Sequence, residues 1–189
     1  DVALVFDELA VVLRPGAASR RAEAGAVAEA LGAFRPLRYI EAPGTIDGGD
    51  VLRLDHLVLV GLSSRTTPRA AAQLDALLRP LGYVVREVRV EGCLHLKTAV
   101  TRVARDAVLL NPAWVDASLF AGYRVVEVDP SEPMAANALP VGDVAIHPQA
   151  FPRTRARLEA AGIAVHAVDV SEIAKAEGGV TCCSVVLRT

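Results

Sequence analysis

Three short segments contain residue types that can support nucleophilic catalysis. Asp47 and Asp50 flank two glycines, so the main chain can approach a ligand closely beside two carboxylates. His95 lies between two leucines, and an imidazole is a natural acid or base near neutral pH. Cys182 and Cys183 lie shortly after two glycines, which leaves a sulfur accessible. A cysteine with a distant histidine and a distant carboxylate is a known arrangement for nucleophilic catalysis.

Each segment also has a structural explanation. The turn around Asp47 can cap a strand, His95 can be a buried core histidine, and the cysteines can be reduced apolar side chains. A zinc site is a further alternative, in which Cys93 and His95 would join the Cys182–Cys183 pair. Because this spacing matches no standard zinc finger and adjacent cysteines chelate one ion poorly, we expect no metal.

The segments are positioned by a repeat of roughly 40 to 50 residues. Each copy has the order strand–strand–helix–strand, with two short apolar runs around a polar turn, then a helix and a third apolar run. The expected copies span about 1–46, 47–94, 95–134 and 135–179, and 180–189 holds the first strand of a fifth.

Helix signals and one terminal strand complete this pattern. Ser19 is the expected N-cap of the first helix. Ser184–Leu187 is expected to be the opening strand of the fifth copy. If the strand begins at the preceding cysteines, Cys182 and Cys183 point to opposite faces. The expected helices run from about Ser19 to Gly32, Thr67 to Leu81, Pro112 to just before Gly122, and Pro152 to Ala161.

A unit this small cannot bury both faces of its sheet alone, so the copies are expected to share one core. We interpret the chain as an α/β fold with a single catalytic domain over 1–189. The expected architecture is a five-fold pseudosymmetric α/β propeller with an incomplete fifth unit, and a plain α/β sandwich is the alternative. In a ring, the junctions that carry Asp47, His95 and Cys182 would meet at one axis.

Composition restricts the class of protein. The 189 residues are 52% hydrophobic and 22% charged, which is typical of a folded chain with a substantial core. A formal charge of −2 predicts no attraction to nucleic acid or anionic lipid. No apolar run reaches the roughly 18 residues needed to span a membrane, and no secretory signal is visible. We therefore expect a cytoplasmic protein.

Five ordered strings give the chain a resemblance to a known family. The chain resembles the dimethylarginine dimethylaminohydrolases, members of the guanidino-modifying superfamily with a five-bladed α/β propeller. The histidine and cysteine strings favour this family over the related arginine deiminases. The strings are Arg14-Pro-Gly-Ala-x-Ser-Arg-Arg21, Asp47-Gly-Gly-Asp-Val51, Gly61-Leu-Ser-x-Arg-Thr66, His95-Leu-Lys97 and Thr181-Cys-Cys-Ser184.

The resemblance implies hydrolysis of Nω-methylated arginine to citrulline and an alkylamine, through a covalent cysteine thiouronium intermediate and without a cofactor. It implies that Cys182 is the nucleophile, His95 the general acid/base and Asp47 the acid of the triad. The substrate-binding residues that it implies are Asp1, Arg20, Arg65 and Ala176, the last through its backbone carbonyl.

The chain also departs from the family. The N-terminal strand, helix and substrate lid of the family domain are absent, so we expect the strand and helix that complete the fifth unit to lie upstream of Asp1. The expected partners are a small guanidine substrate and a missing N-terminal segment of the same protein, in a monomer or homodimer. An arginine deiminase-like hydrolase of another guanidine and a non-catalytic guanidine-binding protein remain alternative functions.

Overall fold

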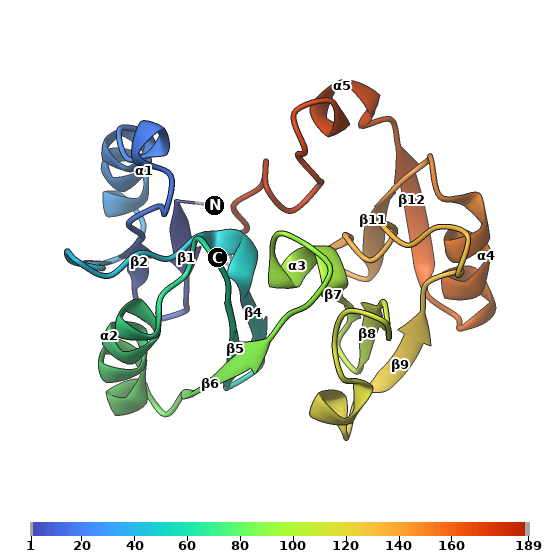
Figure 1. Ribbon diagram of the computed structural model, residues 1–189, viewed down its shortest axis with the longest axis horizontal. Helices are drawn as coiled ribbons and strands as arrows, with labels where there is room; N and C mark the ends of the chain where they lie inside the picture. The colour runs from blue at the N-terminus through green and yellow to red at the C-terminus, as the bar shows by residue number, and fades with distance from the viewer. Residues whose placement is uncertain (1, 188–189) are drawn as a thin grey trace. The chain divides into compact units, whose positions relative to one another are not determined.

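A computed structural model of the protein describes residues 2–187. Within these residues the strands form four three-stranded sheets with one shared connectivity (Figure 1). In each sheet the second strand is central, antiparallel to the first and parallel to the third. The strands are β1 (Ala3–Val5), β2 (Ala10–Val12), β3 (Leu37–Tyr39), β4 (Val51–Leu54), β5 (Leu57–Leu62), β6 (Val84–Arg89), β7 (Val100–Ala104), β8 (Ala107–Leu110), β9 (Arg124–Glu127), β10 (Leu139–Val141), β11 (Val144–Pro148) and β12 (Ala164–Val168).

Helices provide the crossovers between parallel strands in three of these sheets. A parallel pair requires such a connection because a tight turn cannot join the strands. α1 (Glu23–Gly32) joins β2 to β3, α2 (Pro68–Leu78) joins β5 to β6, and α4 (Pro152–Ala160) joins β11 to β12. The remaining helical segments are α3 (Leu96–Ala99), α5 (Ser171–Ala174) and the 3-10 helices η1 (Ala18–Arg20), η2 (Gly48–Asp50), η3 (Arg79–Leu81) and η4 (Ala117–Phe120).

The second copy shows how local sequence fixes these elements. The turn between β4 and β5 places Asp55 at a φ of 53°, a left-handed conformation that aspartate tolerates. Thr67 caps α2, because its side chain accepts a hydrogen bond from the Ala70 N–H and Pro68 occupies the first turn. Gly82, with a φ of 83°, then ends the helical segment and leads into β6.

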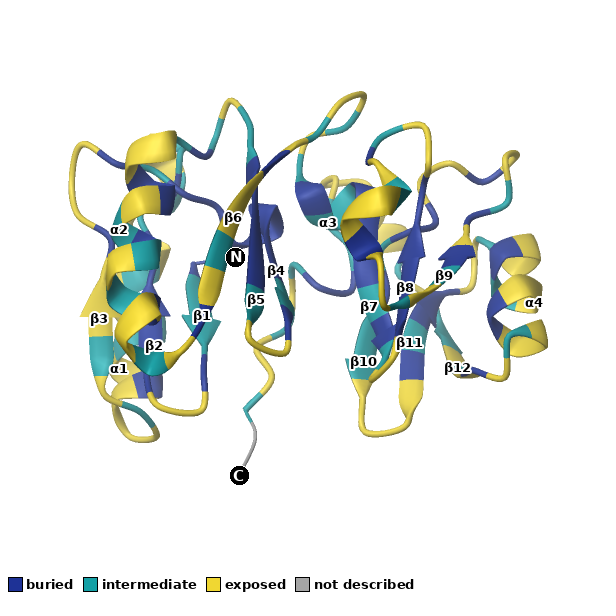
Figure 2. Cartoon of the chain, turned by 90° about the horizontal axis from the view of Figure 1, so that it is seen from below, coloured by how far each residue is buried: buried dark blue, intermediate teal, exposed yellow. Residues whose placement is uncertain are grey.

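The chain divides into two compact units, each with its own core. Unit 1 comprises the described parts of Asp1–Arg89 and Val185–Thr189, and unit 2 is Val90–Ser184. Buried residues are concentrated in the central strands β2, β5, β8 and β11, whereas the outer faces of α1, α2 and α4 are exposed (Figure 2). The core of unit 1 includes Val11 and Leu74. The core of unit 2 includes Leu109 and Leu158.

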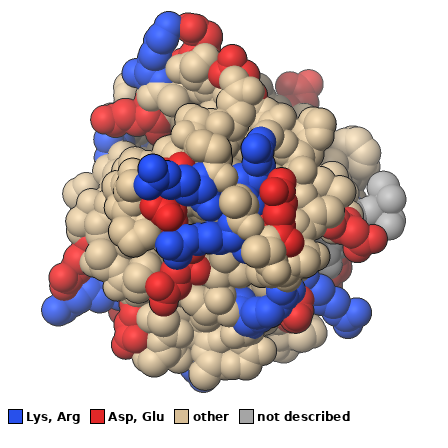
Figure 3. All heavy atoms as spheres, turned by 90° about the vertical axis from the view of Figure 1, so that its right-hand side faces the viewer, with Lys and Arg blue, Asp and Glu red and all other residues tan. Residues whose placement is uncertain are grey.

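Charges are mixed on the face of the molecule shown in Figure 3, where Lys and Arg side chains lie beside Asp and Glu side chains. Ion pairs of unit 2 have the same character, such as Arg157 with Asp129 at 3.2 Å and Arg155 with Glu159 at 3.6 Å. Within residues 2–187, no helix has both the length and the apolarity that crossing a membrane requires.

Two helix predictions require correction. Ser19 is not an N-cap: it lies within η1, and α1 begins only at Glu23, because the chain first makes tight i→i+3 hydrogen bonds. The helix expected from Pro112 is reduced to η4. There the Asn111 and Asp116 side chains accept hydrogen bonds from main-chain N–H groups two residues ahead, and such local bonds compete with a helix.

The expected fifth-copy strand is also wrong. Ser184–Leu187 has no regular secondary structure, and none of the described strands pairs with it. Since a β-strand is defined by its hydrogen-bonded neighbour, apolar alternation alone does not produce one. Cys182 and Cys183 therefore lie in a turn rather than in a strand. Among the described strands the four sheets are separate, and no pairing closes them into a barrel.

Candidate active site

Asp47 lies at the start of η2, with its side chain almost completely buried. Its Oδ1 accepts a hydrogen bond from the Gly16 N–H at 2.8 Å, and its own N–H donates to Thr66 Oγ1 at 3.1 Å. Buried polar groups need such partners, because burial without them is costly. Asp47 is therefore fixed through both its side chain and its main chain.

Asp50, the second carboxylate of the motif, supports the Asp47 loop. It is fully buried, and its Oδ2 accepts hydrogen bonds from Ser63 Oγ at 2.7 Å and Thr66 Oγ1 at 2.6 Å. The same Thr66 hydroxyl oxygen accepts the Asp47 N–H. One hydroxyl thus links the two carboxylate residues within unit 1.

Arg65 lies next to this network. Its N–H donates to Ser63 Oγ at 3.0 Å. Its main chain is so close to Gly16 that a Cβ on Gly16 would lie 2.6 Å from the Arg65 carbonyl oxygen. Because no side chain fits in this space, the close approach requires glycine. Two predicted site residues of unit 1, Asp47 and Arg65, are therefore brought together around Gly16.

Arg20, another predicted substrate-binding residue, lies at the end of η1 and is half-buried. Its Nε and Nη2 each donate to a Glu23 carboxylate oxygen at 3.0 Å. This hydrogen-bonded guanidinium lowers the pKa of Glu23 below its ordinary value. Glu23 thus occupies the guanidinium fork that a substrate carboxylate would use.

His95 is the N-cap residue of α3 in unit 2 and is half-buried. Its carbonyl oxygen accepts the Thr98 N–H at 3.0 Å and lies 3.3 Å from the Cys93 sulfur. The extended main chain at His95, with φ −136° and ψ 154°, turns directly into the helix. The imidazole is therefore carried on a main chain that is fixed by a short helix.

Cys182 lies in the turn that follows Gly179 in unit 2. Its N–H donates to the Gly179 carbonyl at 3.1 Å, and the residue is half-buried, whereas Cys183 is exposed. All three cysteines of the chain are free thiols. The two adjacent sulfurs therefore differ in burial, with Cys182 the more enclosed.

The remaining predicted positions are less informative. Ala176 follows α5, is exposed, and donates its N–H to the Ile173 carbonyl at 3.0 Å. Asp1 lies outside the described residues. Asp47, Arg20 and Arg65 belong to unit 1, whereas His95, Cys182 and Ala176 belong to unit 2. Within residues 2–187, no group of three or more His, Cys, Asp or Glu side chains could hold a metal ion.

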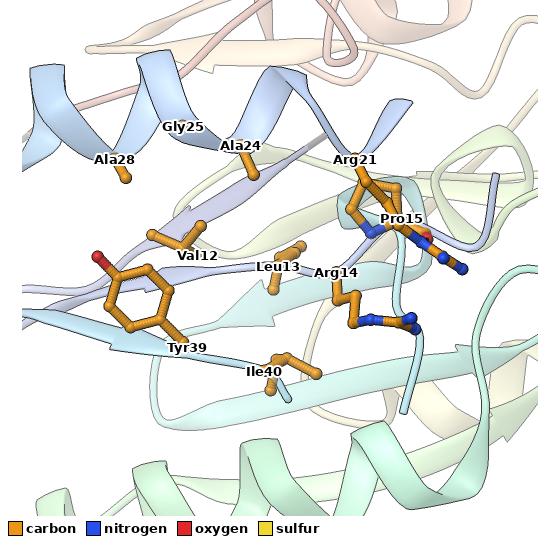
Figure 4. A pocket seen from close by; sticks show the side chains of 10 residues that line it. All are labelled: Val12, Leu13, Arg14, Pro15, Arg21, Ala24, Gly25, Ala28, Tyr39 and Ile40. Atoms are coloured by element: carbon orange, nitrogen blue, oxygen red, sulfur yellow. The ribbon is translucent and has the colours of Figure 1, made fainter. Parts of the chain in front are cut away.

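A groove of about 490 Å³ lies within unit 1, between α1 and the strands β2 and β3 (Figure 4). Small residues on the helix, Ala24, Gly25 and Ala28, leave this space open, and Arg14 and Arg21 lie at one end. Each arginine donates a hydrogen bond to a main-chain carbonyl. The residues that line the groove include none of the predicted site positions.

Comparison with known proteins shows which protein family the chain resembles. The model of the arginine deiminase family matches residues 37–145. The dimethylarginine dimethylaminohydrolase of Pseudomonas aeruginosa is 36% identical over 186 residues, which cover 97% of this chain and 73% of that protein. Its counterpart in Streptomyces coelicolor is 38% identical over 190 residues, covering 100% of this chain and 72% of that protein.

Solved structures agree. A cysteine-to-serine mutant of the Pseudomonas aeruginosa enzyme complexed with citrulline matches with a TM-score of 0.91 and 35% identity, over 96% of this chain and 72% of that one. Fold and sequence together define a hydrolase of the guanidino-modifying superfamily, which acts on guanidino C–N bonds. Within that superfamily, the chain belongs to the dimethylarginine dimethylaminohydrolase family.

Sequence reasoning missed Asn137, a half-buried residue just before β10. Its side chain contacts both the Lys97 and the Thr181 segments of unit 2. A signal was available, because Asn137 lies close to the start of the fourth repeat copy. The candidate residues Asp47, His95 and Cys182 were found at junctions of this kind.

Proposed function

We propose that this protein hydrolyses Nω-methylated arginine to citrulline and an alkylamine, with Cys182 as the nucleophile. The family membership is the observation that carries the proposal. In the related enzymes, one solved structure holds citrulline in a cysteine mutant, and another is an adduct of a histidine mutant with S-methyl-L-thiocitrulline. By the residue numbers of those mutations, the cysteine follows the histidine at the same separation as Cys182 follows His95.

The chemistry takes two stages. The Cys182 thiolate attacks the central guanidinium carbon, and His95 gives a proton to the departing methylamine or dimethylamine as the C–N bond breaks. Water then gives up a proton to His95 and adds to the thiouronium carbon. The C–S bond then breaks as the carbonyl forms and the hydroxyl proton passes to solvent, which releases citrulline and restores the thiolate. The net change is the addition of one water and the loss of one amine.

Other residues take supporting roles in this proposal. Asp47 orients His95, and the cationic substrate attracts the thiolate electrostatically. Arg65 binds the carboxylate of the substrate, and Arg20 joins it when that carboxylate takes the place of Glu23 on the guanidinium. Asp1 holds the guanidinium, and the Ala176 carbonyl adds a contact. The reaction requires no metal or organic cofactor.

The proposal extends to the architecture. The likeness to the Pseudomonas enzyme supports a single catalytic domain over 1–189, built as a five-fold α/β propeller. The repeat units of this domain would span about 1–46, 47–94, 95–134 and 135–179, one for each of the four sheets. The enzyme would act in the cytoplasm, as a monomer or homodimer.

A citrulline assay with asymmetric dimethylarginine tests the nucleophile. Wild-type protein is expected to release citrulline and dimethylamine, whereas Cys182→Ser releases none above background, because serine lacks a thiolate. Cys183→Ser is the matched control, since it makes the same atomic change at the exposed neighbour. An active Cys182→Ser variant would exclude Cys182 as the nucleophile.

The same assay separates the alternative functions. A kcat/KM for arginine above that for dimethylarginine would replace the proposal with a deiminase, as the match to the arginine deiminase family also allows. Binding of dimethylarginine by calorimetry, without turnover of any guanidine, would identify a non-catalytic binding protein.

A further inference from the structure

The Asn137 side chain makes three hydrogen bonds within unit 2, to two segments that carry proposed catalytic residues. Its Nδ2 donates to the Lys97 carbonyl at 3.1 Å and to Thr181 Oγ1 at 2.9 Å. Its Oδ1 accepts the Thr181 N–H at 3.3 Å. An amide has two N–H donors and one carbonyl acceptor, so each of its polar groups has a partner here.

Both hydrogen-bond partners of Asn137 are close in sequence to a proposed catalytic residue. Lys97 is two residues after His95, in the four-residue helix α3, where its carbonyl has little chance of an intrahelical partner. Thr181 immediately precedes Cys182 and is buried. The two contacts are 40 and 44 residues from Asn137 in sequence. One side chain therefore joins the main chain after His95 to the main chain before Cys182.

Asn137 is itself held in place by Thr101 of β7. The buried Thr101 hydroxyl donates to the Ala136 carbonyl at 2.5 Å and accepts the Ala138 N–H at 3.0 Å. These bonds fix the main chain on both sides of Asn137. Ala136 and Ala138 are fully buried, so the peptide has little space in which to move.

Gly179 shows that the turn before Cys182 is fitted closely to this amide. A Cβ at Gly179 would lie 2.5 Å from Asn137 Oδ1 and 2.8 Å from its Cγ. Its φ is not in the left-handed region, so the requirement for glycine here is one of space. The Gly179 carbonyl also accepts the Cys182 N–H, which connects the amide contact to the thiol-bearing residue.

From this geometry we propose that Asn137 is a positioning residue that sets the placement of His95 relative to Cys182. The inference rests on the proposed roles of those two residues. Asn137 touches neither substrate nor a reacting atom in this role. Its contribution is to hold two remote segments in one arrangement, as the support of a catalytic pair requires.

The isosteric variant Asn137→Asp tests the proposal on the full-length protein. The substitution keeps the shape but replaces the donor that faces the Lys97 carbonyl with an oxygen, so the two acceptors repel each other. We expect kcat for dimethylarginine to fall roughly 10- to 100-fold, the scale of a small misplacement of reacting groups. KM should change less than about threefold, since substrate contacts are untouched.

Asn111→Asp is the matched control, because Asn111 is the only other asparagine of the chain and also lies in unit 2. Its Nδ2 donates to the Pro133 carbonyl at 3.0 Å and its Oδ1 accepts the Ala113 N–H at 3.0 Å, with neither partner in the His95 or Cys182 segment. The control is expected to lose stability but to keep kcat within about threefold of wild type.

A second readout does not depend on the substrate. The rate at which iodoacetamide alkylates Cys182, followed against pH and mapped by mass spectrometry, reports how the imidazole influences the thiol. Its midpoint should shift by about half a pH unit or more in Asn137→Asp and stay unchanged in Asn111→Asp. If wild-type protein makes no citrulline from any methylarginine, the proposed function fails, and this profile alone decides the role of Asn137.

Two results would overturn the role of Asn137. One is a folded Asn137→Asp variant with wild-type kcat and alkylation profile. The other is an equal loss of kcat in Asn111→Asp. Should Asn137→Asp fail to fold, Thr181→Val removes one of the three hydrogen bonds and leaves the amide in place. An unchanged profile in that folded variant would then also contradict the proposal.

Discussion

In unit 1, Asp47 is held by a hydrogen-bond network whose central acceptor is the buried carboxylate of Asp50. Apart from Gly16, the residues of this network lie within 20 positions of one another in the sequence. In unit 2, the His95 and Cys182 segments are joined by the neutral amide of Asn137, across 40 and 44 residues. Loss of a buried acceptor that serves two donors leaves both donors without a hydrogen-bond partner, which is costly. We therefore expect removal of the Asp50 carboxylate to lower the stability of unit 1. We expect removal of the Asn137 amide to displace the His95 and Cys182 segments of unit 2 relative to each other.

Asp50→Ala is expected to have the largest effect on stability. The substitution leaves the Ser63 and Thr66 hydroxyls without their shared acceptor in a buried site. Since each buried polar group left without a partner costs roughly 1–3 kcal/mol, the free energy of unfolding should fall by about 3 kcal/mol. Urea titration measures this change. Asp143→Ala, at an exposed carboxylate, is the control, and equal stability of the two variants would remove the contrast between the units.

Gly16→Ala tests whether steric fit is as important as the carboxylate. The added Cβ would meet the Arg65 carbonyl oxygen at 2.6 Å and its Cα at 2.7 Å, so the main chain must shift and the bond to Asp47 Oδ1 must lengthen. We expect a loss of about 1–3 kcal/mol, as for other overpacked sites, together with reduced citrulline production.

Gly25→Ala provides the matched control in the same unit. A Cβ at Gly25 meets no heavy atom within 4 Å, and the residue lies inside α1. Alanine there should raise the free energy of unfolding by about 0.5–1 kcal/mol, because it favours the helix. A Gly16→Ala variant that is as stable and active as Gly25→Ala would show that the Asp47 loop is not closely fitted.

These contrasts also show which features can be read from sequence. The strand–strand–helix–strand repeat was predictable, since apolar runs, polar turns and stops such as Gly82 are local signals. The start of α2 near Thr67 was also predictable, because a capping residue and a proline stand together there. The predictions at Ser19, Pro112 and Ser184–Leu187 failed where tight turns, side-chain caps or the lack of a pairing strand among residues 2–187 override local propensity.

The candidate site was predictable only in part for the same reason. Asp47, His95 and Cys182 stand in recognisable strings, so a resemblance reaches them directly. The residues that hold these three in place do not belong to such sequence motifs. Thr101 and Asn137 act through partners dozens of residues away, so the sequence shows at most that Asn137 lies near a repeat junction and does not show those contacts. A sequence can therefore predict the roles of the motif residues without revealing the residues that position them.

The smallest effect is expected from the titration of His147, which lies under the Asn137 segment of unit 2. His147 is fully buried and its Nε2 lies 2.9 Å from the Ala135 carbonyl, whereas Nδ1 has no hydrogen-bond partner among residues 2–187. Burial lowers the pKa of His147 below its ordinary value. This effect outweighs the hydrogen bond to the Ala135 carbonyl and the nearby Glu132 carboxylate, which both raise the pKa, while Arg155 adds to the lowering.

The sign of the pH effect follows from this lowered pKa. Below about pH 6.5 the unfolded chain binds a proton that the folded chain resists, so folding stability decreases as the pH falls, by at most about 1.4 kcal/mol per pH unit. His147→Gln removes the titrating group and should flatten the stability profile between about pH 6.5 and pH 5. Amide hydrogen exchange should place the wild-type loss in unit 2, near Ala135, and leave the Asp47 loop protected. An undiminished slope in His147→Gln would instead assign the acid sensitivity to another group, and exchange first at the Asp47 loop would identify the carboxylate network as the weaker support.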